Sequence, residues 1–260
     1  MWNILSPLRR KKILQGNGMI YDIAKLRVQL DNRYEYTAKF CREYLSVNQD
    51  LPADITATVS KEEFEQEKSQ SAQFSDGYIE NICLYRSLCL QLPRFQRMLL
   101  HASILEFNGN AYAFLGRSGT GKSTHTRLWM QTIENCRIIN GDKPILEETE
   151  NGFIAHGTPW RGKENWGEKR SAPLKGFCFI EQAKENAIER LTPSETSMRL
   201  FQQILLPTEA QEAVATLEML DRLIAKTPAY LLKCDISEKA VETSFTALTG
   251  LSYEQNRQKK

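Results

Sequence analysis

Hydrophobic and polar positions divide the chain into two regions, and the first extends to about Pro93. Short extended runs occur at residues 19–21, 26–30 and 55–59, and a helical pattern follows them. The apolar residues that recur at helical spacing are Tyr78, Ile82, Tyr85, Cys89 and Leu92. Pro93 ends this helix because proline cannot continue the hydrogen-bond ladder. The charged stretch at residues 61–70 lacks a broad apolar face and predicts an exposed helix or a linker.

The second region, from Arg94 onward, begins with two predicted hairpins. Extended runs at residues 103–107 and 111–115 flank Asn108 and Gly109, a pair typical of tight hairpin turns. Runs at residues 144–148 and 153–155 surround Asn151 and Gly152 in the same way. The apolar segment 174–180 predicts a buried strand.

Helices dominate the remainder of the second region. Thr192, Pro193 and Glu195 form a capping box with proline at the first helical position. A helix follows whose apolar stripe includes Ala213, Val214, Leu217, Leu220 and Ile224. Residues 229–234 predict a strand, and residues 237–248 predict a helix that stops at Gly250.

These patterns predict an α/β protein of two parts. Residues 96–260 form a strand-rich core, and residues 1–95 form a smaller α+β module. The module either recognises an acceptor molecule or completes the core.

Composition narrows the class of protein. The 260 residues have a net charge of +2, with 41% hydrophobic and 25% charged residues, which is typical of a soluble globular chain and gives no reason to expect nucleic acid as a partner. We expect the basic run at residues 9–12 to be solvated. No run of 18 apolar residues predicts a membrane span, and the N-terminus lacks the apolar stretch of a signal peptide. Six scattered cysteines without metal-binding spacing favour reduced, buried thiols in a cytoplasmic protein.

The sequence GRSGTGKST matches the phosphate-binding loop pattern Gly-x-x-x-x-Gly-Lys-Ser/Thr in full. An extended run precedes it and a helical segment follows, as such a loop requires. The predicted nucleotide-binding residues are Gly116, Arg117, Ser118, Gly119, Thr120, Gly121, Lys122, Ser123 and Thr124.

The residue types of this loop suit a polyphosphate. Glycines allow the backbone N–H groups to approach phosphate oxygens closely, and the helix N-terminus adds partial positive charge. Lys122 is expected to contact the β- and γ-phosphates, and the Ser123 hydroxyl to bind Mg²⁺. Asp142, at the end of the extended run 137–140, is the predicted second metal ligand, although an aspartate beside Gly141 is also typical of a simple turn.

The stretch from His101 to Thr124 resembles the catalytic core of the HPr serine kinase/phosphorylase family, whose P-loop fold is shared with phosphoenolpyruvate carboxykinase. The resemblance covers roughly residues 96–260 and is strongest from His101 to Asp142. It implies a P-loop kinase core of that type and transfer of the γ-phosphate of ATP or GTP to a serine hydroxyl. It also implies catalytic roles for His101, Lys122 and Asp142.

One departure from the family pattern concerns Gly141. The family carries two adjacent aspartates, a general base and a metal ligand. An alignment without a gap places Gly141 and Asp142 there, whereas a shifted alignment places Asp142 first and Lys143 second. The first alignment predicts that Gly141→Asp raises phosphate transfer, and the second predicts no gain.

Other charged residues are weaker candidates. In the glycine- and tryptophan-containing segment 156–170, Arg161 or Lys163 is a candidate for contacting phosphate and Glu164 or Glu168 for binding metal. Solvated charges in a loop are the alternative. His125 is expected to pack in the helix after the loop. The helical residues expected at the surface are Arg199 and Arg222.

The sequence thus predicts an ATP- and Mg²⁺-dependent kinase acting on a serine-containing protein, peptide or small molecule. The N-terminal region does not resemble that of the HPr kinases, so HPr itself is not the expected acceptor. A homo-oligomer is compatible with the sequence. The alternatives are a nucleotide-binding module with weak or no phosphotransfer, as the Gly141 departure suggests, and a carboxykinase-like metabolic enzyme.

Overall fold

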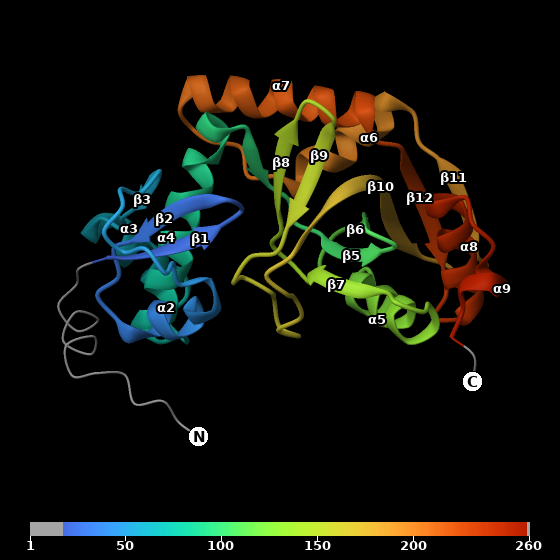
Figure 1. Ribbon diagram of the computed structural model, residues 1–260, viewed down its shortest axis with the longest axis horizontal. Coiled ribbons are helices and arrows are strands. Elements are labelled where there is room, and N and C mark those ends of the chain that lie inside the picture. The colour runs from blue at the N-terminus through green and yellow to red at the C-terminus, as the bar shows by residue number, and fades with distance from the viewer. Residues whose placement is uncertain (1–17, 259–260) are drawn as a thin grey trace. The chain divides into compact units, whose positions relative to one another are not determined.

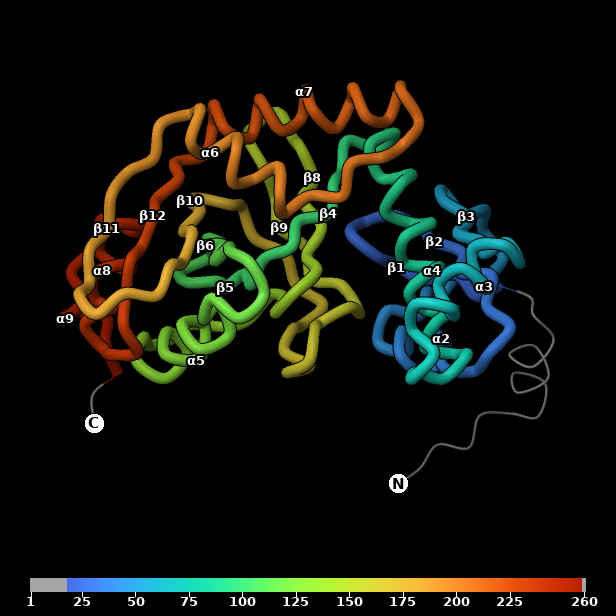
Figure 2. The backbone as a smooth tube through the Cα atoms, turned by 180° about the vertical axis from the view of Figure 1, so that it is seen from behind, coloured from blue at the N-terminus to red at the C-terminus, as the bar shows by residue number. Residues whose placement is uncertain are grey.

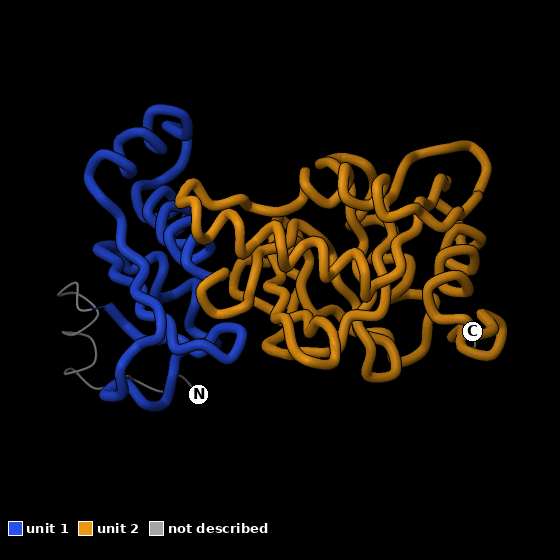
Figure 3. The backbone as a smooth tube through the Cα atoms, turned by 90° about the horizontal axis from the view of Figure 1, so that it is seen from above, with its two compact units in different colours: residues 1–92 blue, residues 93–260 orange. Residues whose placement is uncertain are grey.

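Pro93 marks the point at which the chain passes from one folding unit to the next. The computed structural model describes residues 18–258, so the basic run at 9–12 lies outside the described residues. The chain divides into two compact units, residues 1–92 and 93–260 (Figure 3). We describe each unit separately.

The first unit is a small α+β fold in which a three-stranded sheet accompanies short helices. Strands β1 and β2 pair antiparallel, and β2 pairs parallel with β3. The elements of this unit are β1 (Met19–Ile23), β2 (Leu26–Leu30), α2 (Glu35–Phe40), η1 (Arg42–Tyr44), β3 (Ile55–Ala57), α3 (Lys61–Gln70) and α4 (Asp76–Gln91). The charged stretch 61–70 is therefore a helix, and a capping box between Ser60 and Glu63 begins it.

Helix α4 forms the centre of the first unit, but its buried face differs from the predicted stripe. Tyr78, Ile82 and Tyr85 are only partly buried. The buried residues of the helix are Gly77, Ile79, Glu80, Asn81, Cys83, Leu84, Leu88 and Cys89. The apolar residues of α4 occupy more than one face, so spacing alone did not identify the face that packs inward.

Glu80 is a buried carboxylate that organises the segment before α2. Its two oxygens accept hydrogen bonds from the backbone N–H groups of Arg33 and Tyr34, at 2.8 and 3.0 Å. Burial raises the pKa of Glu80, and these two hydrogen bonds oppose that rise. The carboxylate thus satisfies backbone donors that would otherwise be unpaired.

The second unit is built on a nine-stranded mixed sheet (Figure 1). Seven of its strands have the order β4-β8-β9-β10-β6-β5-β7. The other two are β12, which pairs with β10, and β11, which pairs with β12. Its strands are β4 (Arg97–Leu99), β5 (Ser103–Phe107), β6 (Asn110–Leu115), β7 (Arg137–Asn140), β8 (Ile145–Thr149), β9 (Gly152–His156), β10 (Ser171–Gln182), β11 (Ala187–Arg190) and β12 (Ala229–Cys234). The sheet confirms the predicted α/β class and both predicted hairpins, β5–β6 and β8–β9.

Strand β10 joins the two halves of this sheet. Ser171–Pro173 pair antiparallel with β9, whereas the later residues pair parallel with β6 on one side and with β12 on the other. The sequence predicted only residues 174–180 of this strand. Exposed and buried residues alternate from Ser171 to Gly176, and only residues 177–180 continue as an apolar run that is buried on both faces.

Helices cover both faces of the parallel part of the sheet (Figures 1 and 2). The helices that follow α4 in the chain are η2 (Leu92–Phe95), α5 (Lys122–Thr132), α6 (Pro193–Leu200), η3 (Phe201–Gln203), α7 (Ala210–Lys226), α8 (Glu238–Thr249) and α9 (Tyr253–Asn256). Along β6, Ala111, Ala113 and Leu115 pack in the cluster that contains α6 and α7, while Tyr112 and Phe114 pack in the cluster that contains α5 and α8. The alternation of strand side chains therefore builds one core on each face. The predicted capping box at Thr192 and the helix stop at Gly250 are both confirmed.

All six cysteines lie within the described residues, and all are free thiols, five of them buried. Among residues 18–258, every helix is too short or too polar to cross a membrane.

His125 anchors α5 in the core, as predicted. Its ring packs edge-on against Phe114, and Nε2 lies 2.9 Å from Ser244 Oγ. Ser244 donates its own hydrogen to the Val241 carbonyl and accepts from Trp129 Nε1, so the His125 Nε2 must carry the proton. Burial lowers the pKa of His125 to about 4.

Because His125 is buried and neutral, we expect the free energy of unfolding to fall in acid. Below pH 6.5 the unfolded chain binds a proton that folded His125 resists until about pH 4, so the stabilisation present at neutral pH is lost as the pH falls. The unfolding free energy of the protein relative to that of His125→Gln should decrease by roughly 2–3 kcal/mol between pH 7.5 and 4.5. Chemical denaturation at both pH values measures this difference, and a difference that does not change with pH would contradict the assignment.

Candidate functional site

Strand topology brings three separate segments to one edge of the sheet. Strand β6 ends at Leu115 and runs directly into the glycine-rich loop, residues 116–121, after which α5 begins at Lys122. Strand β5 lies antiparallel between β6 and β7. The end of β6, the start of β5 and the end of β7 therefore share an edge. His101 precedes β5 and Asp142 follows β7, so both residues lie at the edge that carries the loop.

The loop has the backbone conformation that its glycines permit. Gly116, Gly119 and Gly121 have φ angles of 144°, 85° and 104°. A Cβ atom at Gly119 or Gly121 would meet no atom within 4 Å, so these positions need glycine for conformation and not for lack of space. Thr120 closes the turn through its backbone N–H and its hydroxyl, which both donate to the Arg117 carbonyl, at 3.3 and 2.9 Å.

Lys122 lies across this loop instead of extending into solvent. Its Nζ donates to the carbonyls of Gly116 and Arg117, at 2.7 and 3.2 Å, and the residue is 9% exposed. Burial lowers the pKa of Lys122, and the nearby Asp142 carboxylate partly offsets this effect. The ammonium group is thus held in place, with uncharged carbonyl oxygens as its direct partners.

Asp142 is bonded through both oxygens, one to His101 and the other to Lys143. His101 Nε2 lies 3.1 Å from Oδ1, and Lys143 Nζ lies 3.2 Å from Oδ2. Burial favours the protonated acid, but the hydrogen bond from His101 and the charge of Lys143 outweigh it, so the pKa of Asp142 lies below its usual value. Asp142 is therefore an anion at neutral pH.

Asn140, which is fully buried, positions Asp142. Its Oδ1 accepts hydrogen bonds from the backbone N–H groups of Asp142 and Lys143, at 2.9 and 2.7 Å. Its Nδ2 donates to the carbonyl and hydroxyl oxygens of Thr158. The Thr158 hydroxyl in turn donates to the Lys143 carbonyl at 2.7 Å. Asn140 was not singled out in the sequence, although its place at the end of a strand and two residues before Asp142 is typical of such a turn.

Backbone packing around Gly141 leaves little room for a side chain. A Cβ atom there would lie 3.0 Å from the Arg161 carbonyl oxygen and 3.2 Å from that of Trp166. The Gly141 N–H donates to the same Trp166 carbonyl at 2.9 Å. Gly162 is similarly close, since a Cβ atom there would lie 2.7 Å from the Asp142 Cβ. The segment at residues 161–167 thus packs by its backbone against the turn that carries Asp142.

The two candidate glutamates of segment 156–170 lie close to arginines. Glu164 lies 3.7 Å from Arg127, which also stacks over the Trp166 ring at 5.2 Å. Glu168 pairs with Arg170 at 3.0 Å. Lys163 is exposed, and Arg161 is half-buried beside Gly141. Among the described residues, no group of three or more carboxylates, histidines or cysteines is arranged to hold a metal ion.

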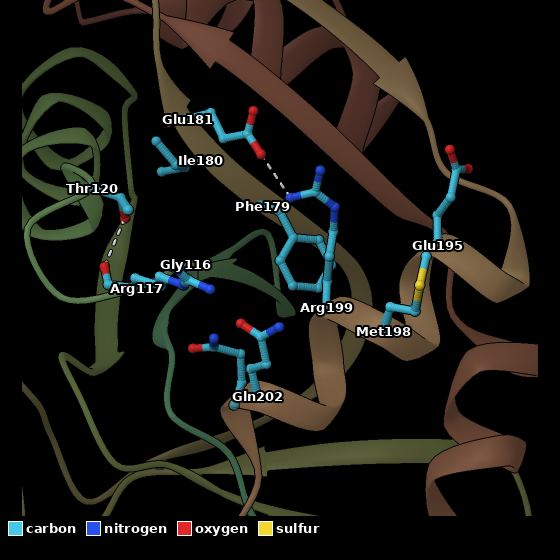
Figure 4. A pocket seen from close by; sticks show the side chains of 11 residues that line it. Gly116, Arg117, Thr120, Phe179, Ile180, Glu181, Glu195, Met198, Arg199 and Gln202 are labelled. Atoms are coloured by element: carbon cyan, nitrogen blue, oxygen red, sulfur yellow. Dashed lines mark hydrogen bonds and ion pairs between the residues drawn. The ribbon is translucent and has the colours of Figure 1, made fainter.

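A cleft of about 550 Å³ opens beside the first residues of the loop (Figure 4). We call it the Arg199 cleft. Gly116, Arg117 and Thr120 form one wall, α6 and η3 form another, and the end of β10 forms the floor. Arg199 pairs with Glu181 at 2.8 Å and lies over the Phe179 ring. Arg199, expected only at the surface, is therefore half-exposed in this cleft, whereas Arg222 of α7 forms a bidentate pair with Glu148 of β8.

Gln203 connects the Arg199 cleft to His101. Its backbone carbonyl accepts from the His101 N–H at 2.7 Å. Its side-chain amide lies 3.3 Å from the His101 carbonyl and 3.2 Å from that of Gly116, and donates to both when its nitrogen faces them. No local sequence pattern points to Gln203, because this contact depends on how α6 and η3 return to the sheet.

Comparison with known proteins gives one family. The family model described as "SynChlorMet cassette protein ScmC" matches residues 78–244. The match begins in α4, ends in α8, and includes the loop, Asp142 and Arg199. No curated protein matches the sequence.

This match corrects the family expected from the sequence. The resemblance to the HPr serine kinase/phosphorylase family is wrong as an assignment, because the family model that matches is a different one. The resemblance depended on a short stretch around a phosphate-binding loop, and unrelated proteins share such loops because the same backbone geometry binds phosphate. The ScmC match covers more than half of the chain, so we conclude that the chain belongs to the ScmC family of SynChlorMet cassette proteins.

Proposed function

We propose that this protein binds a nucleoside triphosphate with Mg²⁺ at residues 116–124 and transfers the terminal phosphate to a hydroxyl group, with serine as the expected acceptor. The observation that carries this proposal is a buried Lys122 ammonium that is held by the carbonyls of a glycine loop, in which Gly119 and Gly121 adjoin open space. A polyphosphate is the ligand that such a loop suits, since backbone N–H groups, a helix N-terminus and a lysine all favour negative charge. The strand-rich core would then be a P-loop kinase core.

The residues present also fit a magnesium ion. The Ser123 hydroxyl, at the second position of α5, and the ionised Asp142 are oxygen ligands of the kind that Mg²⁺ prefers. When bound, Mg²⁺ neutralises charge on the β- and γ-phosphates. Two protein oxygens suffice because Mg²⁺ keeps several waters and binds phosphate oxygens as well.

His101 and Asp142 are the groups available to take the acceptor's proton. The low pKa of Asp142 makes it a weak base, which suits a metal ligand better than a proton acceptor. His101 is held by Asp142 through Nε2, and if that nitrogen donates, Nδ1 is the basic nitrogen. We therefore assign proton acceptance to His101 and metal binding and orientation to Asp142.

The Arg199 cleft is the best place for the acceptor. It adjoins Gly116 and Arg117, and Gln203 links it to His101. Its volume lies within the range of small-molecule sites, about 300–1,000 Å³, and its walls combine Phe179 and Met198 with the Arg199–Glu181 pair.

A second candidate function is nucleotide binding without transfer. The observation that favours it is the engagement of Asp142 by His101 and Lys143, which lowers the pKa of this carboxylate and makes it a weaker base. A nucleotide-dependent sensor needs the loop and Lys122 but no proton acceptor. Incubation with γ-labelled ATP, Mg²⁺ and serine-containing acceptors separates the two, because only a kinase transfers the label.

Replacing Lys122 tests nucleotide binding. Lys122→Ala removes a charged donor, and hydrogen bonds to charged groups contribute about 1.5–3 kcal/mol, so the Kd for Mg-ATP should rise roughly 10- to 150-fold. Calorimetry measures this change. Lys175→Ala, an exposed lysine of β10, is the matched control and should bind as the unaltered protein does. Equal affinity of both variants would contradict the proposed role of Lys122.

Replacing Asp142 and His101 tests catalysis. Loss of a general base typically lowers rates about 10²- to 10⁴-fold, so His101→Gln should lose that much transfer while retaining Mg-ATP binding. Asp142→Asn should lose transfer and also weaken the dependence of ATP affinity on Mg²⁺. Asp221→Asn, an exposed aspartate of α7, is the control. Transfer at an unaltered rate in His101→Gln would contradict the assignment.

Gly141→Asp should not increase transfer. The new carboxylate would crowd the carbonyl oxygens of Arg161 and Trp166, which repel negative charge and already lie within 3.2 Å of the Cβ position. We expect lower thermal stability and an unchanged or reduced transfer rate, measured by differential scanning fluorimetry and by label transfer. A faster enzyme would show that Gly141 occupies the position of a missing base.

A further inference from the structure

A second cleft opens on the other side of the loop from Asp142. We call it the Asp235 cleft. It measures about 340 Å³, and its lining includes Gly121, Thr124, Leu128, Gln182, Asp235 and Ile236. In the sheet, β10 and β12 lie on one side of β6, and β5 and β7 lie on the other. Residues 182–183 and 234–236 end or follow two strands that run parallel to β6, so this cleft lies outside the carboxyl ends of parallel strands, where α/β proteins bind ligands.

The direction of a bound polyphosphate follows from the groups around the loop. Lys122 contacts the β- and γ-phosphates in loops of this type, and Asp142 lies on the β7 side. The terminal phosphate therefore belongs near Lys122 and Asp142. The first residues of α5 continue away from that point, and Thr124 in its first turn lines the Asp235 cleft. The rest of the ligand must leave the loop on this side.

We propose that the Asp235 cleft binds the nucleoside portion of the triphosphate, with the ribose hydroxyls at Asp235 and the base against Leu128 and Ile236. This inference rests on the proposed nucleotide binding and extends it to the part of the ligand that the loop does not contact.

The polar side of the Asp235 cleft suits a sugar. Asp235 Oδ1 accepts hydrogen bonds from Asn186 Nδ2 and Ser237 Oγ, at 2.9 and 2.5 Å, which fix the carboxylate. Both of these side-chain hydrogen bonds end on Oδ1, which leaves Oδ2 as an acceptor for hydroxyl donors. Gln182 Nε2 donates to the Gly119 carbonyl at 3.1 Å and so attaches this wall to the loop itself.

The apolar side suits a base. Ile236 is 77% exposed, which is unusual for an isoleucine, and it borders the cleft together with the half-buried Leu128. A planar base between them would cover apolar surface that is otherwise in contact with water. The Arg199 cleft is a poorer place for the nucleoside, because it adjoins Gly116 and Arg117, whose carbonyls hold the Lys122 ammonium, and is linked to His101 through Gln203.

Inorganic tripolyphosphate separates the two parts of the site, because it has the phosphates of ATP and no nucleoside. Calorimetry with Mg²⁺ should show that the unaltered protein binds ATP more tightly than tripolyphosphate. Asp235→Asn and Ile236→Ser should each raise the Kd for ATP about 3- to 10-fold and leave the Kd for tripolyphosphate within about 2-fold. Matched controls are Asp221→Asn and Val214→Ser, exposed residues of α7 that should change neither affinity.

The outcomes distinguish this inference from the proposed function. Binding of tripolyphosphate as tight as that of ATP, or variants that leave the affinity for ATP unchanged, would overturn the nucleoside site while the phosphate loop stands. A selective loss of ATP affinity in Arg199→Ala would instead place the nucleoside in the Arg199 cleft and also overturn it. If the unaltered protein binds neither ligand, nucleotide binding fails and the nucleoside site fails with it.

Discussion

The position of β5 between β6 and β7 is the constraint on which the candidate site depends. Because β5 runs antiparallel to both neighbours, residues that lie up to about forty positions apart in the chain meet at one edge of the sheet. His101, the glycine loop and Asp142 come together for this reason alone. Side chains of β6 bury on both faces, which fixes its register against β5 and β10, since a slip of one residue would exchange the two faces.

The charges at this edge form a consistent pattern. Lys143 bonds to Asp142 and lowers the pKa of this carboxylate, and Asp142 in turn opposes the lowering of the Lys122 pKa by burial. Carbonyl oxygens hold Lys122, and no carboxylate within residues 18–258 forms an ion pair with it, so its charge is available to an anion that enters the loop. Buried Asn140 and close backbone packing against residues 161–167 hold the turn that carries Asp142 in place. Such positioning before the ligand arrives reduces the reorganisation that binding requires.

Much of this arrangement could be predicted from the sequence, where local signals are strong. The turn pairs Asn108–Gly109 and Asn151–Gly152, the capping box at Thr192 and the glycine loop each identify their own structure within a few residues. What the sequence could not supply depends on tertiary contacts. The inward face of α4 was ambiguous because apolar residues occupy more than one side of it, and Arg199 and Gln203 were missed because α6 and η3 approach the loop only in the folded unit. The sequence resemblance led to the wrong family because a phosphate-binding loop reflects the chemistry of its ligand and occurs in more than one family.

Binding of a polyphosphate by the backbone of residues 116–123 is the central claim of this account. Amide NMR of ¹⁵N-labelled protein titrated with a non-hydrolysable Mg-ATP analogue tests it directly. We expect large downfield shifts for the N–H groups of Gly119, Gly121 and Lys122, since charge-assisted hydrogen bonds to phosphate deshield these protons, with little change at the distant Gly109 turn. Titration that leaves the loop amides unshifted, while the protein remains folded, would contradict it.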